Sequence, residues 1–250
     1  MPETVPANQK ESKETLASFV YDRLRQDIIT VAIEPGEKLH IRALSNRFDV
    51  GLSPVREALS RLSTEGLVAQ NDHRGFTVKP LSEDDLLDLT RARCWLNELA
   101  IRKSVANGNA AWEDQVVLSF HRLSRTPRHE EGNARERSPA GEKAHRNFHT
   151  SLISASGSRR LEQYCEHLFD SSERYRHVGR KAGMKGSNRE QEHRALMEAV
   201  VMRDADAAAR LITEHFERTA ELVRQVLKGL ASSPATLRPP HNLRRIGRNV

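Results

Sequence analysis

Four histidines in the C-terminal part of the chain have a side chain that commonly binds metals. His145 and His149 stand four residues apart, and positions i and i+4 share one face of a helix. His149, His193 and His215 are each in helical phase with apolar residues, which predicts that all three point into a helical interior. Buried imidazoles need partners, and neutral imidazole binds Zn²⁺ and Ni²⁺ well. We therefore expect these histidines to bind a divalent metal, Zn²⁺ or Ni²⁺.

The pattern leaves other interpretations open. The chain has 11 histidines, so a single pair with this spacing arises about half the time by chance. The histidines could instead bind an anionic effector directly, without a metal. They could also activate a water molecule, as in a metal-dependent hydrolase built on a helical bundle. Against the hydrolase, the sequence places no clear general base or nucleophile, and the first 80 residues would have no purpose.

The segment after Pro80, which must position these histidines, is predicted to contain only helices. After Pro80 the apolar residues recur at helical spacing, and Ser82 to Asp85 have the spacing of a helix-capping box. The charged stretch 124–141, which contains Pro and Gly, predicts a long exposed loop, and Gly183 to Gly186 predict a break. The expected helices cover approximately 82–106, 110–124, 140–156, 158–180, 187–203 and 204–229.

The residues ahead of Pro80 follow a different plan. A helical pattern from about Ser12 to Val31 is followed by a Pro-Gly turn, two short helices at about 41–48 and 53–64, and two short strands on either side of a turn at 71–75. Three helices and a hairpin are the layout of a winged helix-turn-helix. The second short helix of that layout can enter the major groove of DNA, and the hairpin can reach the minor groove.

Charge and composition agree with a nucleic-acid partner and exclude a membrane protein. The net charge is +6, and residues 38–80 carry 7 basic against 4 acidic residues, a local patch of the kind that binds phosphate. No apolar run has the length of a membrane helix, and the polar N-terminus lacks the apolar region of a signal peptide. Cys94 and Cys165 lie far apart in helical patterns, typical of buried free thiols in a reducing cytoplasm. We expect a cytoplasmic protein.

The stretch from Glu34 to Val78 resembles the DNA-binding domain of the GntR-family transcription regulators. The resemblance rests on PVREAL at 54–59, EGLV at 65–68 and RGFTV at 74–78. It implies that the second short helix is the recognition helix, although Gly51-Leu52 stands where many members have Ser-Arg, which predicts a different operator preference. The alternative for an arginine here is a solvated side chain or one held in an ion pair within the domain. The residues that the resemblance assigns to DNA are Arg42, Ser53, Arg56, Arg61, His73, Arg74 and Gly75.

The helical region resembles the FCD domain of the FadR-type branch, and is most similar to the glutarate-sensing CsiR/GlaR-like regulators. The stretches HRNFHTSLISASGSRRL and EHRALMEAVVMRDADAAARLITEHF carry this resemblance. It implies a metal site in the bundle core, with His145 at a place where most of the family has an aspartate. Glu142, one turn earlier, could supply that acid or accept the His145 N–H. The resemblance also implies an organic-acid effector, for example a dicarboxylate, bound beside the metal by Arg93 and by Arg174 or Arg176.

These patterns together predict a mainly α protein that is not an enzyme. Residues 13–80 would form the winged helix-turn-helix and 81–230 the FCD domain for effector binding and dimerisation, with a disordered lead at 1–12 and a disordered basic tail at 231–250. We predict a homodimeric transcription regulator, a repressor relieved by ligand, on a palindromic double-stranded DNA operator. An architectural DNA-binding protein without a ligand is a further alternative, which would leave the inward histidines unexplained. Cys94, Trp95 and Trp112 are interpreted as core or interface residues.

Overall fold

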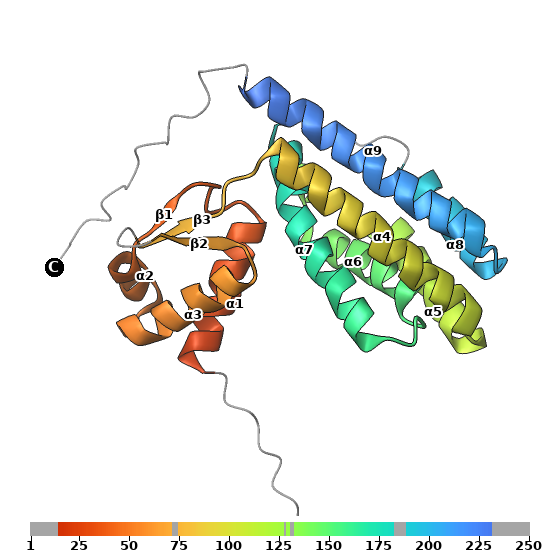
Figure 1. Ribbon diagram of the computed structural model, residues 1–250, viewed down its shortest axis with the longest axis horizontal. Helices are drawn as coiled ribbons and strands as arrows, with labels where there is room; N and C mark the ends of the chain where they lie inside the picture. The colour runs from red at the N-terminus through yellow and green to blue at the C-terminus, as the bar shows by residue number, and fades with distance from the viewer. Residues whose placement is uncertain (1–14, 72–74, 128, 131–132, 183–188, 232–250) are drawn as a thin grey trace, which may run out of the picture. The chain divides into compact units, whose positions relative to one another are not determined.

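The computed structural model describes residues 15–71, 75–127, 129–130, 133–182 and 189–231 (Figure 1). Within these residues the chain divides into two compact units. One unit holds the chain up to Leu81 together with Phe169–His177, and the other holds Ser82–Leu168 and the chain from Val178 onward. The predicted disordered ends, the break at Gly183 to Gly186, and the wing residues His73 and Arg74 lie outside the described residues.

The first unit has the predicted winged helix-turn-helix fold. Its elements are α1 (Leu16–Ile29), β1 (Lys38–Leu39), α2 (Ile41–Phe48), α3 (Leu52–Thr64), β2 (Val68–Asn71) and β3 (Gly75–Val78). The strands form one antiparallel sheet in the order β1-β3-β2, with Val68 opposite Val78. Strand β1 was not predicted, because two residues are too few to show a periodic pattern.

The core of the first unit lies between α1 and α3. The apolar residues on the inward face of each helix recur at helical spacing and are buried, so α3 packs through one face and its other face points outward. Gly66 follows the C-cap residue Glu65 and has φ 74°, a left-handed conformation that favours glycine and ends the helix before β2. The buried residues of the two helices include Val20, Leu24, Ile28, Val55, Leu59 and Leu62.

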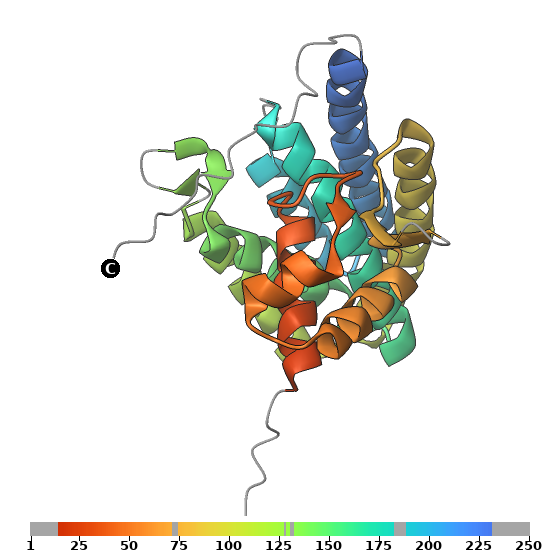
Figure 2. The same ribbon diagram turned by 90° about the vertical axis from the view of Figure 1, so that its left-hand side faces the viewer.

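The second unit is a helical bundle. Its helices are α4 (Glu83–Asn107), α5 (Ala110–Arg125), α6 (Pro139–Ile153), α8 (Arg189–Val201) and α9 (Ala205–Ala231), together with the two ends of α7 (Arg159–Lys181). Helices α4 and α9 lie side by side in both views (Figures 1 and 2), and α6 packs on α4 and α5. No helix among the described residues is long and apolar enough to cross a membrane.

Polar caps explain where the helices of the second unit begin. The Ser82 hydroxyl accepts a hydrogen bond of 3.1 Å from the Asp85 amide, as the capping-box spacing predicts. Ser138 and Ser158 cap α6 and α7 in the same way, and Pro139 occupies the first position of α6.

The prediction of one long loop over 124–141 is wrong. Helix α5 continues to Arg125, and α6 begins at Pro139. Between them β4 (His129–Glu130) and β5 (Asn133–Arg137) pair antiparallel with an irregular register. Charge and Pro/Gly content predict a segment outside the core, but they do not decide whether its backbone pairs across a turn.

Candidate metal centre and nucleic-acid interface

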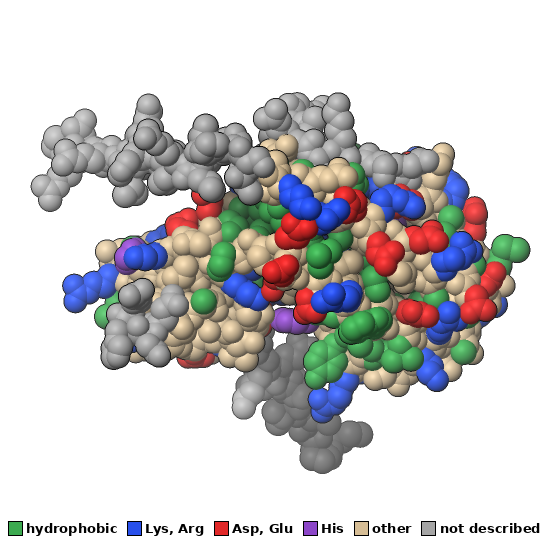
Figure 3. All heavy atoms as spheres, turned by 45° about the horizontal axis from the view of Figure 1, so that its top comes forward, with side chains coloured by type: hydrophobic (Ala, Val, Ile, Leu, Met, Phe, Trp, Pro, Cys, Tyr) green, Lys and Arg blue, Asp and Glu red, His purple; other side chains and the backbone are tan. Residues whose placement is uncertain are grey.

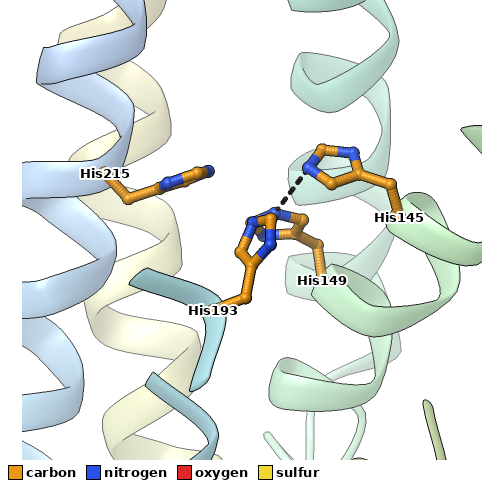
Figure 4. Close-up of side chains that lie close together, drawn as sticks. All are labelled: His145, His149, His193 and His215. Carbon is orange, nitrogen blue, oxygen red and sulfur yellow. Dashed lines mark hydrogen bonds between the residues drawn. The ribbon is translucent and has the colours of Figure 1, made fainter. Parts of the chain in front are cut away.

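Four histidines from three helices of the second unit converge in its interior. His145 and His149 lie one turn apart on α6, His193 lies on α8, and His215 lies on α9 (Figure 4). One ring nitrogen of each histidine lies within 4.8 Å of those of the other three. The Nε2 atoms of His145 and His149 are 3.2 Å apart. Two nitrogens that bind one tetrahedral Zn²⁺ at about 2.0–2.1 Å would be about 3.3 Å apart. The residues therefore fit a divalent metal.

The histidine cluster is shielded from solvent by aromatic side chains. Each of the four residues keeps 6% or less of its surface exposed. The Phe148 ring lies 5.2 Å from the His193 ring, and the Phe216 ring lies 5.9 Å from the His149 ring, measured between centroids. A buried set of imidazoles favours Zn²⁺, Ni²⁺ or Cu²⁺ over Mg²⁺ and Ca²⁺, which prefer oxygen ligands.

Glu192 connects the histidine cluster to a partly exposed arginine. Its Oε2 lies 2.7 Å from Nδ1 of His215, and its Oε1 accepts a hydrogen bond from Arg218. The hydrogen bond with His215 and then that with Arg218 lower the pKa of Glu192 to about 2, against the opposing effect of burial. An ionised Glu192 accepts the Nδ1 proton, which leaves Nε2 of His215 able to bind a metal. No sequence pattern assigned Glu192 a role, although it directly precedes His193.

Glu142, the acid that the sequence offered as a substitute ligand, is engaged with Arg180. Nη2 of Arg180 donates a hydrogen bond of 2.8 Å to Oε1 of Glu142, and burial lowers the pKa of this arginine. Among the described residues, the ring nitrogen of His145 lies with those of the other three histidines, and the group that they form contains no carboxylate. The geometry therefore favours His145 over Glu142 as the fourth donor.

Of the three candidate effector arginines, Arg93 lies in the same unit as the histidines. It is buried on α4, with its guanidinium carbon 3.9 Å from the centroid of the Phe216 ring. Burial lowers the pKa of Arg93 to about 10, so it remains a cation at neutral pH. Arg174 and Arg176 lie in the part of α7 that belongs to the first unit, where Arg174 donates to the Lys79 carbonyl and Arg176 pairs with Glu173.

The predicted DNA-contacting residues of α2 and α3 point away from the core of the first unit. Arg42, Ser53 and Arg56 are all exposed, whereas Val55 and Leu59 of α3 are fully buried. The N-cap residue of α3, Gly51, has no side chain to bond the first amides of the helix. These amides can therefore donate to a phosphate, helped by the helix dipole.

The two other described residues that were predicted to contact DNA are Arg61, near the end of α3, and Gly75, at the start of β3. The guanidinium carbon of Arg61 lies 4.0 Å from the centroid of the Tyr21 ring, and its Nη1 donates to Oγ of Ser18 at 3.3 Å. These contacts lie within the first unit and are a ring contact and a hydrogen bond, not the ion pair that the sequence offered as the alternative. Gly75 begins β3 with φ 82°, which favours glycine, and it is exposed.

Comparison with known proteins decides the family of this chain. Residues 16–78 match the bacterial regulatory proteins of the gntR family, and residues 88–218 match the FCD domain. The chain belongs to the GntR family of transcription regulators. It is not an enzyme, since the family and the relatives below are transcription regulators, and the hydrolase alternative is therefore set aside.

Two related transcription regulators are similar in sequence to this chain over most of their length. The chain is 37% identical over 211 residues to the HTH-type transcriptional regulator BphR of Paraburkholderia xenovorans (strain LB400), covering 84% of this chain and 86% of BphR. It is 32% identical over 220 residues to the HTH-type transcriptional repressor GlaR of Escherichia coli (strain K12), covering 84% and 96%. The solved structure of E. coli McbR/YncC has the same fold, with a TM-score of 0.67 at 19% identity over 84% of this chain and 98% of that chain.

Proposed function

We propose that this GntR-family regulator is a homodimeric repressor that binds a palindromic DNA operator through its first unit. Residues 13–80 would form the DNA-binding domain, with Arg56 contacting bases and Arg42 and Ser53 contacting phosphates. His73, Arg74 and Gly75 would reach the minor groove from the wing. The support is the outward placement of Arg42, Ser53 and Arg56 on two adjacent helices, together with the likeness to a protein named as a repressor.

Residues 81–230 would form the effector domain, built around a metal held by His145, His149, His193 and His215. The observation that carries this proposal is the convergence of four buried imidazoles, with their donor atoms within 4.8 Å of one another. The metal would supply a Lewis acid that attracts a carboxylate. Glu192 would orient His215 and place one negative charge beside a site with no carboxylate ligand.

The effector would be a small organic acid, for example a dicarboxylate, bound beside the histidines. Arg93 supplies a buried cation whose guanidinium contacts the Phe216 ring, and that ring lies 5.9 Å from the His149 ring, so a second carboxylate could pair with Arg93. The ligand would bind one conformation of the regulator better than the other and so lower its affinity for the operator.

A homodimer would bury an apolar stretch that α4 leaves exposed. Leu87, Trp95 and Leu99 keep 40%, 69% and 48% of their surface accessible, whereas Trp112 belongs to the core. Figure 3 shows apolar side chains interrupting the charged surface of the molecule. Tryptophan is enriched at interfaces, and a second copy of this chain would present the same apolar residues to cover them.

The test combines DNA selection with a metal and ligand assay on the full chain. We expect the purified protein to select a palindromic sequence from a random DNA library, and to contain or take up about one metal per chain. Glutarate, succinate and adipate are then screened for a rise in melting temperature. Protein that selects no sequence would refute the operator proposal. Protein that neither contains nor takes up Zn²⁺ or Ni²⁺ would refute the metal site. Stabilisation by a dicarboxylate in that case would favour the alternative in which the histidines bind the effector directly.

A further inference from the structure

An apolar side chain lies at the start of the helix that carries Arg56. Leu52 is the first residue of α3, and it keeps 43% of its surface exposed. It is not part of the buried core cluster of the first unit, whose α3 members begin at Val55. Its neighbours along the outward side of the helix are polar, namely Ser53 and Arg56, and both are exposed.

The N-terminal residues of a recognition helix are those that meet base edges in the major groove. The 5-methyl group of thymine is the one apolar group that the base pairs present in this groove, and aliphatic side chains recognise it by contact. Leu52 lies one helical turn before Arg56, so the two side chains stand on adjacent parts of the same face and would read neighbouring bases.

We propose that Leu52 is a specificity-determining residue that contacts the 5-methyl group of a thymine in each operator half-site. This inference rests on the proposed function of α3 as the recognition helix. Covering one methyl-sized group contributes roughly fourfold to affinity for each half-site. The proposal therefore predicts a preference for thymine beside the base that Arg56 contacts.

The experiment replaces thymine by deoxyuridine, which lacks only the methyl group. The operator is first selected from a random library by the full chain, and each thymine of a half-site is then replaced in turn. We expect one position at which the replacement weakens binding of the parent protein by about fourfold per half-site. Leu52→Ala should bind the thymine and deoxyuridine operators equally well. Leu16→Ala, which removes another exposed leucine of the same unit, should respond to the replacement as the parent does.

The outcomes separate this proposal from the proposed function. Failure to select any sequence would overturn both. Two results would overturn the role of Leu52 alone. One is an operator on which no deoxyuridine replacement weakens binding of the parent more than binding of Leu52→Ala. The other is an operator whose half-site contains no thymine. If Leu52→Ala fails to fold or to bind, Leu52→Val provides the comparison, because its shorter side chain should reduce the response to the replacement.

Discussion

The two units of this regulator treat their chemically active side chains in opposite ways. The first unit holds α3 by an apolar face and leaves Ser53 and Arg56 in solvent, where neither side chain is needed for the fold. The second unit buries four histidines among aromatic rings. An exposed charge costs little when it has no partner, whereas a buried polar group needs one.

Because of this difference, mutations in the two units should have different effects. Substitutions on the outward face of α3 should change DNA binding and leave stability unaltered. Substitutions in the histidine cluster should change stability and ligand binding together.

Removing the metal should destabilise the second unit and no other part of the described chain. A ligand present at 1,000 times its Kd stabilises a folded protein by about 4 kcal/mol, so a chelator should lower the free energy of unfolding of the parent by an amount of this order. The loss should appear as a lower melting temperature. His149→Ala should melt at a lower temperature and should not respond to the chelator. His121→Ala, which changes an exposed histidine of α5, should respond as the parent does. Equal chelator responses of His149→Ala and the parent would contradict the metal site.

Arg56→Ala should weaken operator binding without changing the melting temperature. Loss of a base contact costs about 1–3 kcal/mol per half-site, whereas removal of an exposed side chain changes stability by about 0.5 kcal/mol or less. Fluorescence anisotropy with labelled operator measures the first quantity, and thermal unfolding measures the second. Arg91→Ala removes one exposed positive charge from the other unit and serves as the control for net charge. If Arg56→Ala bound the operator with the affinity of the parent, Arg56 would not be a base-contacting residue of α3.

Glu192→Gln should lower metal affinity by about tenfold or more while keeping the four ligands. The amide can still contact Nδ1 of His215, but it carries no negative charge. Competition with a metal-binding dye measures this affinity. Arg218→Gln should have a smaller effect, because Arg218 acts on His215 only through Glu192. A metal affinity of Glu192→Gln equal to that of the parent would limit Glu192 to a structural ion pair.

Tyr21→Phe should lower the free energy of unfolding by about 1 kcal/mol at neutral pH, because the hydrogen bond to Glu65 is lost. Burial, followed by the hydrogen bond to Glu65, raises the pKa of Tyr21 from 10.0 to about 12. Because the folded pKa exceeds the unfolded one, the stabilisation is full below pH 10 and is lost as the pH rises toward 12. Denaturation at a series of pH values should show a smaller alkaline loss in Tyr21→Phe. The same alkaline loss in both proteins would contradict this role of Tyr21.

Periodicity and capping made most of the fold predictable. The apolar spacing of each long helix, together with capping serines such as Ser82, located the helices to within a few residues. The pairing of β4 with β5 was not predictable, because short strands show too little periodic pattern and the segment is rich in charge.

The sequence also predicted which histidines face inward, since the helical phase of His149, His193 and His215 follows from neighbouring apolar residues. It could not predict that Glu192 meets His215, because that contact depends on how α8 packs against α9. The stacking of Arg61 on Tyr21 likewise joins residues of two helices that are far apart in the chain. Contacts of this kind are set by tertiary packing and leave no local pattern.

In the proposed mechanism, a ligand at the buried histidines controls the affinity of the exposed helix for DNA. The most direct test is a titration of labelled operator with the metal-loaded full chain, with and without glutarate, succinate or adipate. We expect one of these dicarboxylates to weaken operator binding of the parent by about 5- to 150-fold, and to leave the operator affinity of His149→Ala unchanged. An operator affinity of the parent that no dicarboxylate alters, or an equal response in His149→Ala, would contradict the account.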